Sequence, residues 1–128
     1  MVPVELRDEY REYHDKVVKI TNKQDLSTLT NIEKRGVIGK DEDAYHVDHI
    51  FSIYDGFMND VPADVIGNIC NLQCIPGLIN ITKRNDSWIT LKELYDRYEH
   101  QYLSLSMSLF LLLHQLLLPY RHLLSQSF

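Results

Sequence analysis

Residues 45–50 read Tyr45-His46-Val47-Asp48-His49-Ile50, and two further polar blocks follow them, Asn71-Leu72 and Asn80-Ile81-Thr82-Lys83. Loose alternation of apolar and polar residues predicts a short strand over 45–53. Neighbouring side chains of a strand point to opposite faces. Asp48 and His49 can therefore share one site only where the strand ends or bends.

The sequence on either side of this strand predicts a mainly helical chain. Apolar residues at helical spacing predict a helix over 4–20, and the polar stretch 21–43 predicts loops. Pro62 suits the first turn of a short helix over 63–66. A second strand is expected over 71–75, ended by Pro76-Gly77, and a brief helix over 79–85. Thr90 and Glu93 match a capping box, which predicts a helix to about residue 102.

Length and composition indicate a single globular domain. The chain has 128 residues, of which 45% are hydrophobic and 24% charged. Its formal net charge of −5 excludes a uniformly basic nucleic-acid-binding coat. Cys70 and Cys74 are too few for a disulfide framework and are interpreted as small buried apolar residues, as Tyr54, Phe57 and Trp88 are interpreted as core residues. The N-terminal residues lack the apolar run of a signal peptide, so we expect a cytoplasmic location.

The charges of the chain are unevenly distributed. Residues 16–40 hold six Lys and Arg against two acidic residues, a net +4, whereas residues 41–64 hold seven acidic residues and no Lys or Arg, a net −7. Both stretches could be solvated loops and helix faces. The alternative is a phosphate-binding arm beside a site that attracts a cation. Asp41, Glu42 and Asp43 are interpreted as an exposed acidic turn.

The C-terminal segment is rich in leucine. Residues 100–120 contain no Asp, Glu, Lys or Arg, and Pro119 ends the run. A membrane-spanning helix needs about 20 mostly apolar residues, which this run falls a little short of. We favour a packed or oligomerising helix, which predicts a homo-oligomer. A membrane-associating tail and a terminus foreign to the domain stay open as alternatives.

The three polar blocks contain residue types that suit phosphodiester hydrolysis. The Asp48 carboxylate can hold a hard divalent cation, and the His49 imidazole can take a proton from water near neutral pH. The Asn71 amide can fix the loop after the first strand. Asn80 offers a second oxygen ligand, with water and phosphate oxygens completing the coordination.

The order and spacing of Asp48-His49-Ile50, Asn71-Leu72 and Asn80-x-x-Lys83 resemble the HNH nuclease motif, the ββα-metal or His-Me finger. The wider stretch 45–73 is similar to HNH endonucleases of large tailed bacteriophages. The resemblance covers about residues 30–98 and implies an α+β fold, with a ββα-metal finger over 45–85 in a small mainly helical domain. Residues 1–44 then supply an N-terminal helix and basic loop, 86–102 a capping helix, and 103–128 a Leu-rich tail of open role.

The resemblance also implies a catalytic site. Asp48 matches the first metal ligand, and His49 matches the general base that activates water. Asn71 matches the residue that holds the strand's loop and orients the base. Asn80 matches the second metal ligand, which is His in many members, and Asn85 could replace it in another helix register. One divalent ion is expected, Mg²⁺ by default, with Mn²⁺, Ni²⁺ and Zn²⁺ open.

The partner implied by the resemblance is DNA. Lys83 and Arg84 are expected to contact its phosphates, and His46 either contacts phosphate or is a surface histidine. The chain lacks the zinc-binding cysteine pairs of many family members. We therefore expect a metal-dependent DNA endonuclease, in the host cytoplasm if a phage encodes it. The alternatives are a catalytically inactive HNH-like module that binds nucleic acid or protein, and an oligomeric or membrane-associated interaction protein driven by the tail.

Overall fold

The computed structural model of the chain describes residues 1–37, 39–41 and 43–120, so Glu42 of the expected acidic turn and tail residues 121–128 lie outside it. The chain divides into two compact units, Met1–Tyr98 and Glu99–Phe128, and each is described by itself. The α-helices and strands are α1 (Arg7–Asn22), β1 (Tyr45–His49), α2 (Ile53–Met58), α3 (Ala63–Ile66), β2 (Leu72–Pro76), α4 (Gly77–Lys83) and α5 (Leu91–Leu117). Short 3-10 helices lie at Val4–Leu6, Leu26–Thr28, Ile32–Lys34, Ile69–Asn71 and Leu118–Tyr120.

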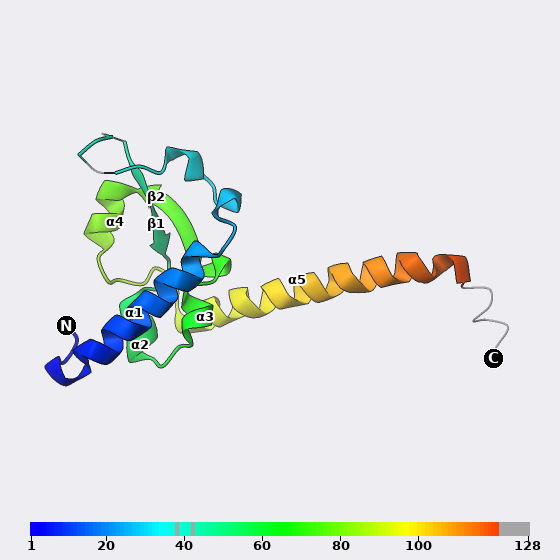
Figure 1. Cartoon of the computed structure of the whole chain (residues 1–128), viewed down its shortest axis with the longest axis horizontal. Coiled ribbons are helices and arrows are strands. Elements are labelled where there is room, and N and C mark those ends of the chain that lie inside the picture. The colour runs from blue at the N-terminus through cyan, green and yellow to red at the C-terminus, as the bar shows by residue number, and fades with distance from the viewer. Residues whose placement is uncertain (38, 42, 121–128) are drawn as a thin grey trace. The chain divides into compact units, whose positions relative to one another are not determined.

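The sheet of the first unit has two strands. β1 and β2 pair antiparallel, with Tyr45 opposite Pro76 and His49 opposite Leu72. α4 begins at the residue after β2 and lies against the strand pair (Figure 1). The unit is thus mixed helix with a small antiparallel sheet, which confirms the α+β class.

The first strand is shorter than the sequence predicts. β1 ends at His49, and the predicted strand residue Ile53 instead begins α2. Ser52 caps this helix, because its hydroxyl accepts a hydrogen bond from the Asp55 amide at 3.0 Å. The apolar residues Ile50 and Phe51 are buried in the turn between the two elements. The sequence pattern predicted that these two residues are buried as part of a strand. In the structure they are buried as part of the turn between β1 and α2.

The other predicted elements occur with small shifts. The first predicted helix is present as a 3-10 turn followed by α1, and α3 has the predicted bounds with Pro62 as its N-cap. β2 starts one residue later than predicted, and α4 starts and ends two residues earlier. The capping box is present, since the Thr90 hydroxyl accepts from the Glu93 amide at 3.1 Å and the Glu93 carboxylate accepts from the Thr90 amide at 3.0 Å.

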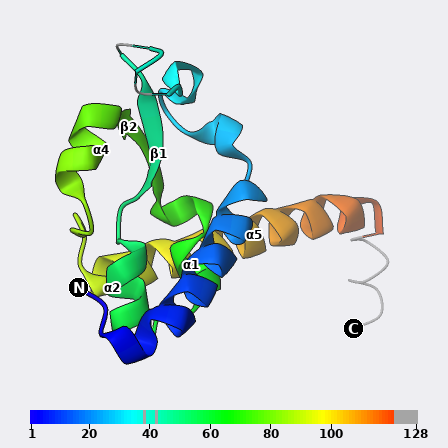
Figure 2. The same cartoon turned by 60° about the vertical axis from the view of Figure 1, so that its left-hand side comes forward.

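The core of the first unit is formed by α1, α2, α3 and the first turns of α5. Val17, Ile66 and Leu94 are fully buried there. α1 lies beside α2 and α3 in Figure 2. Gly67, which follows α3, permits this approach, because a Cβ atom at that position would lie 2.9 Å from the Val17 carbonyl oxygen. The close contact places the Gly67 backbone next to the last turn of α1.

The second unit continues α5 beyond the predicted end at residue 102. The chain carries no proline or glycine between residues 91 and 117, and the α-helix ends just before Pro119. Its apolar side chains are exposed, with Leu103 at 65% and Leu109 at 60%. Within the described ranges, no helix combines the length and apolar character needed to cross a bilayer.

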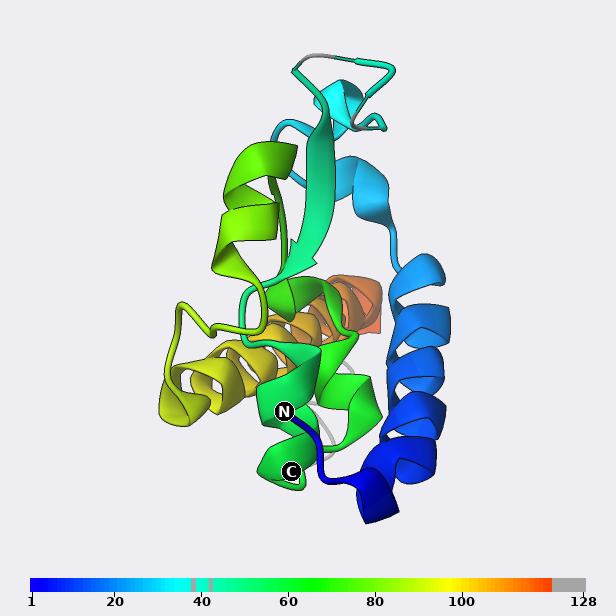
Figure 3. The ribbon, with the colours of Figure 1, turned by 90° about the vertical axis from the view of Figure 1, so that its left-hand side faces the viewer.

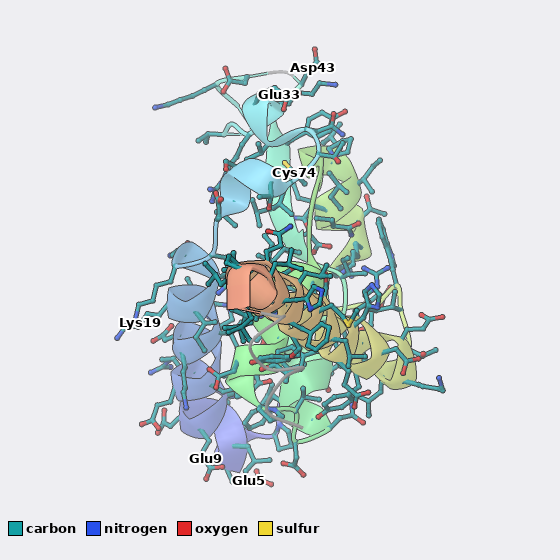
Figure 4. The ribbon with its side chains drawn as sticks, turned by 90° about the vertical axis from the view of Figure 1, so that its right-hand side faces the viewer. Glu5, Glu9, Lys19, Glu33, Asp43 and Cys74 are labelled. Carbon is teal, nitrogen blue, oxygen red and sulfur yellow. The ribbon has the colours of Figure 1, made fainter. Side chains whose placement is uncertain are left out.

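The basic residues of the stretch 16–40 lie in two places, at α1 and around a cleft that they share with carboxylates. Lys19, on α1, points away from the body of its unit (Figure 4). Glu33 and Asp43 lie at the opposite end of the unit from Glu5 and Glu9 in the same view. A cleft of about 970 Å³ at that end is lined by cations and carboxylates together, namely Glu33, Lys34, Arg35, Lys40, Asp41 and Asp43. The positive charges there face acidic neighbours rather than open solvent alone.

Candidate functional site

A cleft of about 130 Å³ lies where the end of β1 meets α1, α2 and α4. Figure 3 shows α4 and α1 on opposite sides of the end of β1. Because β1 ends at His49, Asp48 and His49 both line the cleft, as a shared site requires. Lys83, Arg84 and Asn85 reach it from the end of α4, and Tyr10, His14, Ser52 and Ile53 complete the lining.

One ring nitrogen of His49 is fixed from α1. Its Nε2 lies 2.9 Å from the Thr21 hydroxyl oxygen, which in turn lies 3.4 Å from the Gly67 carbonyl oxygen. When Thr21 donates to that carbonyl, it accepts a hydrogen bond from Nε2–H, and the lone pair of the ring is then on Nδ1. Nδ1 has no hydrogen-bond partner among the described residues. Every buried side-chain nitrogen or oxygen atom of those residues does have a partner, so Nδ1 is not a buried atom. Nδ1 therefore keeps some solvent-accessible surface.

The environment keeps His49 neutral. Burial lowers the pKa of its imidazole from 6.5 to about 4, with further lowering by the charges of Lys83 and His14. The imidazole is therefore uncharged at neutral pH. It holds a lone pair in the form that a general base needs.

The low pKa of His49 makes stability depend on pH. Between pH 6.5 and pH 4 the unfolded chain binds a proton at His49 that the folded chain does not. The shift corresponds to about 3 kcal/mol of folding free energy, present near pH 7 and lost as the pH falls to 4. Urea unfolding at several pH values should show this loss in the wild-type chain and a loss smaller by that amount in His49→Gln. Equal pH dependence in the two chains contradicts the assignment.

Asn71 holds the turn that follows β1. Its side chain is fully buried, and its Oδ1 accepts from the Phe51 amide at 2.8 Å. Its Nδ2 donates to the carbonyl oxygens of Phe51 at 3.0 Å and Ile66 at 2.9 Å. The Asn71 carbonyl oxygen also accepts from the Ile50 amide at 2.8 Å. These bonds fix the two residues directly after His49, in agreement with the position that the sequence predicts for Asn71.

Asp48 forms a buried ion pair with Lys83. The Lys83 ammonium lies 3.3 Å from Oδ1 of Asp48, and the two side chains are 1% and 8% exposed. The ammonium also donates to the His49 carbonyl oxygen at 2.9 Å and lies 5.6 Å from the centre of the Trp88 ring. Gln73, which faces Asp48 across the sheet, donates to Oδ2 at 2.8 Å. Both carboxylate oxygens are thus engaged by protein donors.

Asn80 does not reach Asp48 in this arrangement. Its Nδ2 donates to Nδ1 of His46 at 3.2 Å, and neither residue lines the cleft. His46 and Asp48 lie on one face of β1, and Asn80 and Lys83 lie one helical turn apart on α4. Asn80 therefore pairs with His46, and Lys83 pairs with Asp48. His46 meets a side chain of α4, so it is neither in the cleft nor a plain surface histidine.

The side chains as they lie do not fit a divalent ion held by Asp48 and Asn80. The expected oxygen ligands are separated, and an ammonium stands at the carboxylate. Among the residues that the structure describes, no three His, Cys, Asp or Glu side chains are grouped to hold a metal. Asn85, the alternative ligand, does line the cleft. The metal expected from the resemblance stays a prediction.

Arg84, the residue that follows α4, has an unusual backbone conformation. Its φ is +51° and its ψ is −126°, in a region that non-glycine residues rarely adopt. Such strain costs of the order of 1–3 kcal/mol and is concentrated at functional sites. The loop beyond Arg84 is fixed by Ser87, which accepts from the Ser52 amide at 2.8 Å and donates to Asp55 at 2.6 Å. Arg84 is thereby held at the wall of the cleft with its side chain exposed.

Several site residues have no signal in the sequence. Thr21 and His14 come from α1, and Gln73 comes from β2, so only the packing of distant segments brings them to Asp48 and His49. Trp88 was expected in the core but is 49% exposed and stacks with the Lys83 ammonium. A strand-pairing rule could have found Gln73 once the register was known, because it is the direct partner of Asp48.

Comparison with known proteins adds no assignment, because no family model, curated protein or solved structure matches this chain.

Proposed function

We propose that this chain is an endonuclease of the HNH type that hydrolyses phosphodiester bonds in DNA with His49 as general base. The single observation that carries the proposal is the arrangement at the end of β1. A neutral histidine with one ring nitrogen fixed by Thr21 and the other partly accessible to solvent lines a cleft with a lysine and an arginine. β1, β2 and α4 also follow one another along the chain, with α2 and α3 between the two strands, and this order supports the proposal.

The proposed reaction assigns roles to residues in the cleft and to two residues behind it. Water attacks phosphorus, and Nδ1 of His49 takes its proton. The bond from phosphorus to the leaving 3′ oxygen breaks, and that oxygen takes a proton from solvent. Arg84, whose side chain is exposed at the cleft, supplies positive charge for the phosphate oxygens, on which negative charge builds up, whereas Lys83 neutralises the buried Asp48. Asn71 and Thr21 act as positioning residues, because they contact the histidine or its turn and not the substrate.

The proposed substrate is DNA in the cytoplasm. Contacts to phosphates position a protein on DNA without reading its sequence, so the cleft by itself predicts cleavage with little sequence preference. Affinity should fall as salt rises, because binding releases counterions from the DNA.

Nicking of supercoiled plasmid by the purified full chain at low salt tests the proposal. We expect nicked circles to form in proportion to protein and time, more slowly at high salt. The reaction is run with Mg²⁺, with Mn²⁺ and with EDTA, because the proposal requires hydrolysis in at least one of them. DNA that is bound in a salt-sensitive way but never cut instead supports the inactive binding module. Absence of both binding and cutting contradicts a role on DNA.

We also propose that the second unit joins two or more copies of the chain. Between Tyr102 and Leu118 its leucine, methionine and phenylalanine side chains are 46–65% exposed. A helix that is apolar over most of its circumference is normally buried against a partner. Serine, histidine and glutamine supply its only polar side chains from residue 103 to 118, so nothing charged opposes contact with a like helix.

Replacing Leu109, Leu112 and Leu116 with glutamine should convert an oligomer to a monomer in sedimentation equilibrium. These three residues share one face of α5, and their burial would stabilise association by about 1.5–3 kcal/mol each. The matched control replaces Ser104 and Ser108 with glutamine and should leave the mass unchanged. A wild-type chain that sediments as a monomer contradicts the proposal, and flotation of that monomer with lipid vesicles would favour the membrane alternative.

A further inference from the structure

Asp48 and Lys83 form a buried ion pair at the cleft. Asp48 and Lys83 come from β1 and α4, and their side chains are almost completely removed from water. Burial of a charge is costly unless the charge is paired and hydrogen-bonded. Here the carboxylate has Lys83 on one oxygen and Gln73 on the other, so both of its oxygens accept a hydrogen bond.

The Lys83 ammonium has the surroundings of a bound cation. A carboxylate oxygen lies 3.3 Å from Nζ, a backbone carbonyl oxygen 2.9 Å from it, and the face of the Trp88 ring 5.6 Å from it. Carboxylate and carbonyl oxygens are the groups that bind hard cations, and aromatic faces attract ammonium ions. These three groups together form a binding site for a cation, and the cation bound there is the ammonium of Lys83.

A divalent ion at Asp48 would meet two obstacles. It would stand beside an ammonium, and like charges at such a distance repel strongly inside a protein. It would also lack Asn80, which is bonded to His46.

We propose that the Lys83 ammonium takes the place of a divalent cation at Asp48, and that removal of this ammonium converts Asp48 into a divalent-cation site. The part of the inference that concerns hydrolysis rests on the proposed nuclease function, whereas the part that concerns ion binding does not. With Lys83 in place the reaction needs no bound metal. Water forms the bond to phosphorus, its proton goes to His49, and the leaving 3′ oxygen takes a proton from solvent.

Binding of Mn²⁺ to the full chain, measured by electron paramagnetic resonance, tests the ion-binding part. We expect no Mn²⁺ binding that depends on Asp48 in the wild-type chain. Lys83→Met and Lys83→Gln should each bind one Mn²⁺ at least about tenfold more tightly than the wild-type chain, since the opposing charge is gone. Adding Asp48→Asn to either variant should remove that binding. Mn²⁺ should raise the melting temperature of the Lys83 variants and not that of the wild-type chain.

Two results overturn the inference. One is a wild-type chain that binds Mn²⁺ and loses it on Asp48→Asn. The other is a pair of folded Lys83 variants that both fail to bind Mn²⁺. Lys83→Gln keeps an amide that can donate to the same oxygens, so the test remains available if Lys83→Met does not fold.

Plasmid nicking in EDTA tests the hydrolysis part. We expect the wild-type rate in EDTA to equal its rate in Mg²⁺, and the Lys83 variants to lose activity in EDTA. Wild-type nicking that occurs only with a divalent ion overturns the inference but leaves the nuclease proposal intact. Absence of nicking in every buffer removes the nuclease proposal, and the Mn²⁺ measurements then decide the ion-binding part by themselves.

Discussion

His49→Ala is expected to lower the rate of plasmid nicking by about 100- to 10,000-fold, the usual contribution of a general base. The imidazole is neutral at pH 7, and its Nδ1 has no hydrogen-bond partner among the described residues. Alanine removes the proton acceptor and leaves Lys83 and Arg84 in place. Binding of DNA should therefore change little while the rate falls.

Three measurements make the loss specific to His49. His100→Ala, at an exposed position of α5, is the matched control and should keep the wild-type rate. Thermal unfolding shows whether His49→Ala is folded under the assay conditions. Added imidazole should restore part of the activity, because the substitution leaves space beside Thr21. Nicking that persists at the wild-type rate in His49→Ala excludes His49 as the base.

Asn71→Ala is expected to lower the free energy of unfolding by about 3–5 kcal/mol. The substitution removes three buried hydrogen bonds and leaves the Phe51 amide and two carbonyl oxygens without partners, at about 1–3 kcal/mol for each unsatisfied group. A domain of this size has a total stability of about 5–15 kcal/mol, so the variant should be marginal at room temperature. Urea unfolding at pH 7 measures the difference.

Two further asparagine variants show how large the stability loss of Asn71→Ala is by comparison. Asn71→Asp keeps the acceptor for the Phe51 amide but loses both donated bonds, so its loss should be at least as large as that of Asn71→Ala, because a buried charge is added. Asn68→Ala removes a single cap, in which the side chain accepts from the Cys70 amide at 2.9 Å, and should lower stability by about 1 kcal/mol. Equal losses in Asn68→Ala and Asn71→Ala would show that Asn71 does not hold the turn.

The local features of this fold could be read from the sequence. Helical periodicity predicted α1. The capping box of Thr90 and Glu93 predicted the start of α5, and Pro76-Gly77 predicted the end of β2. The condition that Asp48 and His49 share a site only at the end of a strand also follows from the alternation of side chains alone. In each case the controlling interaction joins residues a few positions apart, so the chain's order is enough to specify it.

Only the tertiary structure decided how the site is assembled. The HNH resemblance implied that Asn80 and Asp48 bind one metal ion, whereas in the structure Asn80 contacts His46 and Lys83 contacts Asp48, because of where α4 packs on β1. Thr21 reaches His49 across 28 residues of chain, and Gln73 reaches Asp48 across 25. A helix advances by a different distance per residue than a strand does, so the pairs that meet depend on where the helix sits along the strand. That position is set by the packing of α4 against β1 and β2, which no short stretch of sequence contains.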